Sequence, residues 1–137
     1  MWKILVVDDE VLNRKLIRES LTELANCVCV ASGAEAIEAF ELAIAEDKPF
    51  DIVLLDIAMP EMDGVQALKR LREIEEKKGV LFGTGTPILM VTAFTNPFMK
   101  SFREGADGYI VKPLEPDKMI EDIRKVLDAR KNQKKEN

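Results

Sequence analysis

Residues 51–64 read DIVLLDIAMPEMDG, and this stretch decides the fold that we predict. It contains a continuous apolar run, Ile52–Leu55, between Asp51 and a turn that contains Pro60. A short apolar run of this kind indicates a strand that is buried on both faces, as in a parallel sheet. Asp56 directly follows the run, and in an open α/β sheet ligands bind where the strands end. Asp56 is therefore a candidate nucleophile or metal ligand.

The composition of the whole chain predicts one globular domain. The chain has 137 residues, of which 47% are hydrophobic and 33% charged, and its net charge is −5. No apolar run approaches the ~20 residues that span a bilayer, and carboxylates interrupt the N-terminal apolar run too early for a signal peptide. We therefore expect a cytoplasmic protein with no membrane and no nucleic acid among its partners, because a net negative charge gives no general attraction to phosphate backbones.

The residues that are missing exclude several kinds of chemistry. The chain has no histidine, so it cannot donate phosphate from histidine or use a Ser-His-Asp mechanism. Its two cysteines, Cys27 and Cys29, are too few for a disulfide framework. We interpret them as small buried hydrophobic residues on one face of a strand.

Five strand-like runs alternate with five helical patterns along the chain. The strands are predicted at Lys3–Val7, Cys27–Val30, Ile52–Leu55, Ile88–Val91 and Gly108–Val111. The helices are predicted at Val11–Leu24, after Ser32, after Asp63, at Asn96–Glu104 and after Pro116. This alternation predicts an α/β fold, a flavodoxin-like doubly wound parallel sheet with strand order 2-1-3-4-5 and helices on both faces. We expect the domain to span residues 1–129 and residues 130–137 to form a solvated basic tail.

The predicted strand order brings five functional groups to one edge of the sheet. Asp8, Asp9 and Asp56 would lie side by side, and Thr92 and Lys112 end the fourth and fifth strands. Three neighbouring carboxylates repel one another unless a cation lies among them, and all-oxygen ligands suit Mg²⁺, with Mn²⁺ as an alternative. A carboxylate surrounded by a metal, an ammonium and a hydroxyl is the set that phosphoryl transfer needs. Each residue alone has a plain structural explanation, but together they predict a phosphorylation site at Asp56.

Four motifs resemble the receiver domain of two-component response regulators over about residues 3–129. They are LVVDDE at 5–10, LLDIAMPEMDG at 54–64, VTA at 91–93 and GADGYIVKP at 105–113. The resemblance implies a CheY-like fold and a phosphoacceptor that is not an enzyme in the usual sense, although it promotes its own phosphorylation and dephosphorylation. It also implies that Asp56 accepts phosphate from a histidine kinase or a histidine phosphotransfer protein in a two-component system or phosphorelay.

The resemblance also implies a role for each residue of the site. The metal ligands would be Asp8, Asp9 and Asp56 together with the carbonyl of Ala58. The phosphoryl oxygens would contact Thr92 and Lys112.

The resemblance further implies a conformational switch. Tyr109 holds the position of the switch aromatic residue, Thr92 would move when Asp56 is phosphorylated, and the Lys112–Pro113 bond would be cis. The output face would combine the 96–104 helix, the 108–111 strand and the last helix. It would bind a downstream protein that the sequence does not identify, and a homodimer through the same face is left open.

Two departures from the family pattern stand out. The interval between Thr92 and Lys112 is slightly short, and the 77–86 segment is long, as in receivers of hybrid kinases. Ala58 lies two residues after Asp56, Phe94 lies two residues after Thr92, and both are apolar. We therefore expect that neither side chain orients a water molecule for attack and that the acyl phosphate is long-lived. Phe98, Met99 and Phe102 in the shortened helix are candidates for a partner surface.

Several readings of the function stay open beside a single-domain receiver. The chain could be a receiver fragment of a hybrid histidine kinase or a larger regulator, or an interaction module that works without phosphorylation. A flavodoxin-like electron carrier is disfavoured because residues 8–10, Asp-Asp-Glu, repel phosphate. A haloacid-dehalogenase phosphatase is disfavoured because Ala58 stands where that family has its second aspartate.

Overall fold

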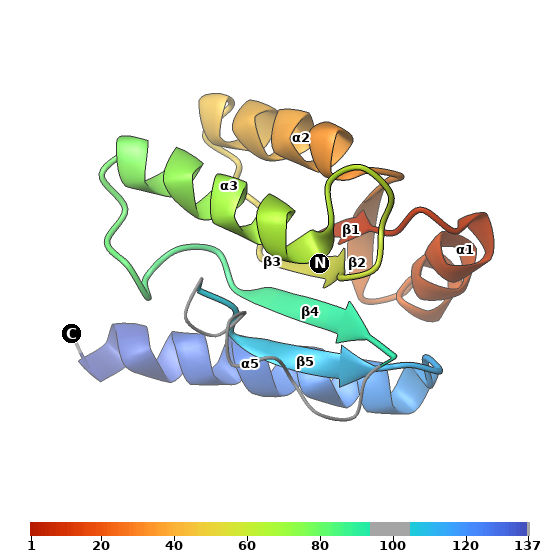
Figure 1. Ribbon diagram of the computed structural model, residues 1–137. Helices are drawn as coiled ribbons and strands as arrows, with labels where there is room; N and C mark the ends of the chain where they lie inside the picture. Colours follow the sequence, from red (N-terminus) through yellow and green to blue (C-terminus); the bar gives the residue numbers. More distant parts are fainter. Residues whose placement is uncertain (94–104, 137) are drawn as a thin grey trace.

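The computed structural model describes residues 1–93 and 105–136, and within them the chain forms one parallel sheet (Figure 1). Its five strands run in the order β2-β1-β3-β4-β5, as predicted. They are β1 (Trp2–Val7), β2 (Ala25–Val30), β3 (Ile52–Asp56), β4 (Ile88–Thr92) and β5 (Gly108–Val111). The register pairs Val7 of β1 with Leu55 of β3, so that the two strands end side by side.

In the part of the chain that the structure describes, four helices cover the two faces of the sheet. They are α1 (Val11–Ser20), α2 (Gly33–Ala45), α3 (Gly64–Lys77) and α5 (Pro116–Glu136). Helices α2 and α3 pack on one face, and α1 and α5 pack on the other (Figure 1). Within the ranges that the structure describes, no helix combines the length and the apolar character that crossing a bilayer demands.

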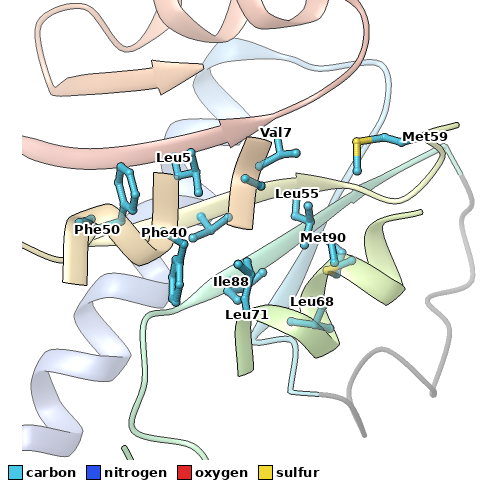
Figure 2. Packing of buried hydrophobic residues seen from close by; sticks show 14 residues of the cluster. Leu5, Val7, Phe40, Phe50, Leu55, Met59, Leu68, Leu71, Ile88 and Met90 are labelled. Atoms are coloured by element: carbon cyan, nitrogen blue, oxygen red, sulfur yellow. The ribbon is translucent and has the colours of Figure 1, made fainter. Parts of the chain in front are cut away.

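Alternate side chains of each strand enter two separate cores. Leu5 and Val7 point into the core under α2 and α3, whereas Ile4 and Val6 point into the core under α1 and α5. Figure 2 shows the first of these cores, in which residues from the strands meet Phe40 and residues of α3. Burial on both faces explains why the strands appear in the sequence as continuous apolar runs.

The predicted starts of two helices are confirmed by their caps. The side chain of Ser32 accepts a hydrogen bond from the N–H of Glu35 at the start of α2. At the start of α3, Asp63 and Gln66 form a reciprocal capping box, with bonds of 2.9 and 3.0 Å. These bonds satisfy N–H groups that have no partner inside the helix.

The first helix is shorter than predicted. It ends at Ser20 rather than at Leu24, and residues 21–24 turn into β2. The hydroxyl of Ser20 donates to the carbonyl of Leu16, and the hydroxyl of Thr22 donates to that of Arg18. Side-chain bonds of this kind compete with the helical pattern and favour its end.

The segment from Arg130 onward differs in part from the predicted solvated tail: residues 131–133 are exposed, but the segment is helical and Arg130 has a partner. Helix α5 continues to Glu136, and the half-buried side chain of Arg130 pairs with Asp107 at 2.8 Å. Good helix-forming residues extend α5 there, and the ion pair holds it to the body of the domain. The predicted 96–104 helix and its candidate partner surface lie outside the described residues.

Candidate functional site

The acidic residues predicted from the sequence meet at one edge of the sheet. Asp8 and Asp9 follow β1, and Asp56 is the last residue of the neighbouring β3. One carboxylate oxygen from each of the three lies within 4.8 Å of the others. The predicted strand order therefore places these groups where one cation could contact all three.

Two of these carboxylates are buried and incompletely bonded. Asp8 is 1% exposed and Asp56 is 2% exposed. The Oδ1 atom of Asp8 accepts the N–H of Glu10 at 2.9 Å, but the Oδ2 atoms of Asp8 and Asp56 have no hydrogen-bond partner among the described residues. Buried carboxylate oxygens without a partner are costly, so the pair fits a bound divalent cation.

Lys112 supplies the positive charge of the site. Its Nζ atom lies 3.2 Å from Oδ1 of Asp56 and 3.9 Å from Oδ2 of Asp8. The backbone N–H of Lys112 donates to the carbonyl of Thr92 at 2.7 Å, which fixes the end of β5 against the end of β4. The three carboxylates and one ammonium leave two formal negative charges, which a divalent cation would balance.

The surroundings of Asp56 oppose its ionisation. Burial raises the pKa of Asp56 above its ordinary value, and the charge of Asp8 raises this pKa further. The Lys112 ammonium and the N–H of Ala58, which hydrogen-bonds Asp56, lower the pKa without cancelling the rise. A cation at the acidic cluster would favour the anionic form, which is the form that acts as a nucleophile.

The start of α3 packs closely on the end of β3. The N–H of Gly64 donates to the carbonyl of Ile57 at 2.8 Å. A Cβ atom on Gly64 would lie 2.2 Å from the carbonyl oxygen of Asp56, which is too close for any side chain. Gly64 thus lets the helix approach the strand that carries Asp56.

The two residues predicted to form a switch have different surroundings. Thr92 ends β4 and is 3% exposed, whereas Tyr109 is half-buried and packs against the core under α2 and α3. The Lys112–Pro113 bond is cis, as expected. The roles of Thr92 and Tyr109 in a switch, and of the carbonyl of Ala58, an exposed residue, as a metal ligand, stay predictions.

The sequence alone did not reveal two further features. Arg14 of α1 donates from Nη1 to the backbone carbonyl of Asp8 at 2.7 Å, and so helps hold the acidic edge. At the opposite edge of the sheet, Arg72, Asp107 and Arg130 form an ion-pair network. Partners this far apart in sequence give no periodic signal, and only the fold brings them together.

Solved structures of receiver domains resemble this fold closely. The chemotaxis protein CheY4 of Vibrio cholerae has a TM-score of 0.76 and 31% identity over 92% of this chain and 98% of its own. The receiver domain of the histidine kinase CKI1 from Arabidopsis thaliana, solved with Mg²⁺ and BeF₃⁻, has a TM-score of 0.75 and 27% identity over 90% of each chain.

Sequence comparisons lead to the same family. The family model described as "Response regulator receiver domain" matches residues 4–124. The transcriptional regulatory protein SrrA of Staphylococcus aureus is 37% identical over an alignment of 128 residues, and the alignment covers 91% of this chain and 47% of SrrA. The chain thus spans about half the length of the curated relatives it matches. With its fold, its acidic edge and this match over most of its length, the chain belongs to the receiver domains of two-component response regulators.

Proposed function

We propose that Asp56 accepts a phosphoryl group from a phosphohistidine donor in a Mg²⁺-dependent reaction, and that the acyl phosphate switches the output face. Receiver domains as a family are signalling phosphoacceptors that bind Mg²⁺ at an aspartate cluster and interact with histidine kinases or phosphotransfer proteins. One observation carries the proposal: the buried carboxylate of Asp56 has an unpartnered oxygen and a lysine ammonium 3.2 Å from its other oxygen.

The chain's own residues suit an in-line transfer. An anionic oxygen of Asp56 attacks the phosphorus, the P–N bond of the phosphohistidine breaks, and its electron pair returns to the imidazole of the donor. Lys112 neutralises charge on the phosphoryl oxygens, and the hydroxyl of Thr92 is a donor for one of them. Asp8 and Asp9 would hold Mg²⁺ with Asp56, and the bound ion supplies further charge neutralisation. No general base is needed, because the nucleophile attacks as an anion.

The switch would begin with Thr92 and Lys112. The phosphoryl group adds charge and acceptor oxygens beside both side chains, which favours their movement toward Asp56. Movement of Thr92 would change the space available to Tyr109, which lies on the neighbouring strand β5. The face that includes β5 and α5 would then bind a downstream protein, or a second copy of the chain.

An exposed apolar surface beside the site suits a protein donor. Val11 and Leu12 begin α1 directly after the acidic residues, and they are 65% and 77% exposed. Apolar side chains so close to the phosphorylation site can pack against a donor protein, whereas a small phosphodonor does not need them. Leu12→Ser should therefore slow transfer from a phosphohistidine protein and leave phosphorylation by acetyl phosphate unchanged. Equal slowing with both donors would contradict this role.

Intact-mass measurement tests the phosphoacceptor directly. With acetyl phosphate and Mg²⁺, the wild type should gain the mass of one phosphoryl group, and Asp56→Asn should gain none. Asp128→Asn is the matched control, because Asp128 is an exposed carboxylate on α5 and should leave the gain intact. A mass gain that persists in Asp56→Asn would refute the proposal, as would the absence of any gain in a wild type that binds Mg²⁺.

Two settings are proposed for the domain. Because the relatives are about twice as long, a receiver that works as part of a larger regulator is the second candidate beside a single-domain adaptor. A cytoplasmic location fits both candidates, since the phosphodonors of this family act there. The mass and native size of the protein isolated from its own cells would separate the two.

A further inference from the structure

Asp107 joins three separate parts of the domain at the edge opposite Asp56. Its Oδ2 atom accepts the N–H of Ile88 at 2.8 Å and an N–H of Arg72 at 3.0 Å. Its Oδ1 atom accepts an N–H of Arg130 at 2.8 Å. Both oxygens of the Asp107 carboxylate therefore accept hydrogen bonds, and these bonds connect it to β4, α3 and α5.

Arg72 fixes this carboxylate from the side of α3. Its guanidinium also donates to the carbonyl of Gly105 at 3.1 and 2.8 Å and to the carbonyl of Thr86 at 2.8 Å. Glu75, which is 5% exposed, accepts from Arg72 at 2.6 Å and from the N–H of Thr86 at 2.7 Å. A planar guanidinium bonded on several sides has little freedom, so Arg72 is a fixed base for the network.

Arg130 lies on a part of α5 beyond the residues that the family model matches. The match ends at residue 124, while α5 continues to Glu136. Besides Asp107, Arg130 hydrogen-bonds the carbonyl of Gly85, which belongs to the connection between α3 and β4. The extra turns of α5 are thus tied both to this connection and to the residue that precedes β5.

The strand β5 connects this network to the phosphorylation site. It has four residues, and in the described part of the chain it pairs with β4 alone. At its start, the N–H of Asp107 donates to the carbonyl of Ile88 at 2.8 Å; at its end, the N–H of Lys112 donates to the carbonyl of Thr92 at 2.7 Å. Because β5 has only four residues, a displacement of Asp107 at its start can shift Tyr109 and Lys112 as well.

We propose that Arg130 is a positioning residue for the switch: through Asp107 it sets the position of β5, and with it Tyr109 and Lys112. The inference rests on the proposed function, because it concerns the same switch. Linkage makes the effect reciprocal, so phosphorylation at Asp56 also changes how firmly Arg130 holds α5. A partner protein that binds the end of α5 would in this way change the rate at which Asp56 is phosphorylated.

The single tyrosine of the chain allows a direct test. Protein labelled with 3-fluorotyrosine gives one ¹⁹F resonance, that of Tyr109, recorded without ligand and with Mg²⁺ and beryllofluoride. Arg130→Gln removes the ion pair, and Lys131→Gln is the matched control, because it removes the same charge from the neighbouring exposed residue. Asp107→Asn is a second variant that breaks the link from its other side.

We expect Arg130→Gln and Asp107→Asn to move or broaden the Tyr109 resonance already in the ligand-free protein, with Lys131→Gln like the wild type. The rate of phosphorylation by acetyl phosphate should fall about two- to thirtyfold in both variants, the range found for residues along coupled networks. Arg130→Lys should recover part of the loss. A lower melting temperature with an unchanged resonance and rate would show a purely structural role and overturn the inference. Failure of the proposed function would look different, since the wild type itself would then gain no phosphoryl group.

Discussion

Replacing Asp56 by asparagine should stabilise the protein in the absence of divalent cations. The change keeps the shape of the side chain and removes its charge. In the wild type the nearest oxygens of Asp8 and Asp56 lie within 4.8 Å, a repulsion of about 3 kcal/mol at an effective dielectric constant of ~20. The attraction to Lys112 at 3.2 Å is larger, about 5 kcal/mol at the same dielectric constant.

On these figures Lys112 attracts the carboxylate by about 2 kcal/mol more than Asp8 repels it. Burial opposes the charge, and the raised pKa of Asp56 shows that burial and repulsion together outweigh the attraction. Asp56 is 2% exposed and its Oδ2 atom has no hydrogen-bond partner in the described residues. An unpartnered buried polar atom costs about 1–3 kcal/mol, and a charged one costs more, so removing the charge should outweigh the lost attraction to Lys112. Asp56→Asn should therefore raise the free energy of unfolding by about 1 kcal/mol near pH 7. Each 1 kcal/mol shifts the melting temperature by about 2–8 °C in domains of this size range.

The pH dependence of this difference has a definite sign. The pKa of Asp56 is raised in the folded protein above its ordinary value of 3.8, so the folded state binds the proton more tightly than the unfolded state. The wild type therefore loses stability as the pH rises from the ordinary pKa through the folded pKa, and the asparagine variant does not. The advantage of Asp56→Asn should be complete above the folded pKa and disappear below about pH 4.

Urea unfolding in EDTA, followed by circular dichroism at several pH values, measures the difference. Mg²⁺ should reverse the order of the two proteins, because a ligand at 100 times its Kd stabilises the state that binds it by about 2.7 kcal/mol. Asp128→Asn, at an exposed position, should match the wild type throughout. An asparagine variant that is less stable than the wild type in EDTA at pH 7, or an advantage that grows on acidification, would refute this reasoning.

Three further predictions concern single residues. Gly64→Ala should lower the free energy of unfolding in urea by about 1–3 kcal/mol and slow phosphorylation, because its Cβ would lie 2.2 Å from the Asp56 carbonyl oxygen. If the variant had the stability and phosphorylation rate of the wild type, α3 would be free to shift away from β3. Burial, helped by the charge of Cys29, raises the pKa of Cys27 to about 11. Cys29→Ser removes the smaller cause and leaves burial, so the alkylation rate of Cys27 in this variant should level off above the ordinary thiol pKa of 9.0; levelling at or below that value would contradict the role of burial. Ala58→Asn should shorten the life of the acyl phosphate by orienting water, which decay measurements would contradict if the phosphate persisted.

The sequence was sufficient for the sheet and for the acidic edge. Continuous apolar runs such as Ile52–Leu55 and the alternation of strands with helices predicted the strand order that is observed. Strand order in turn placed Asp8 beside Asp56, because residues that follow neighbouring parallel strands meet at one edge. These predictions succeeded since each depends on local patterns and on a small set of allowed connections.

The features that were missed depend on contacts between distant residues. The polar composition beyond Ala129 suggested a tail, but the charge of Arg130 has its partner at Asp107, more than twenty positions away. The end of α1 at Ser20 was missed because side-chain bonds compete with the helix where the apolar pattern still continues. Glu75 likewise cannot be told from a surface carboxylate in the sequence, because its partners Arg72 and Thr86 are brought to it only by the fold.

The placement of reactive groups at strand ends has a consequence for how such a domain can diversify. Every residue of β3 and β4 is buried, while the helices present their outer faces to solvent. Substitutions on an outer face, such as at Leu12, change what another protein meets without touching the residues that hold the phosphoryl group. Choice of partner and chemical competence can thus evolve separately, and duplicated copies of one gene can acquire separate signalling routes while keeping the same reaction.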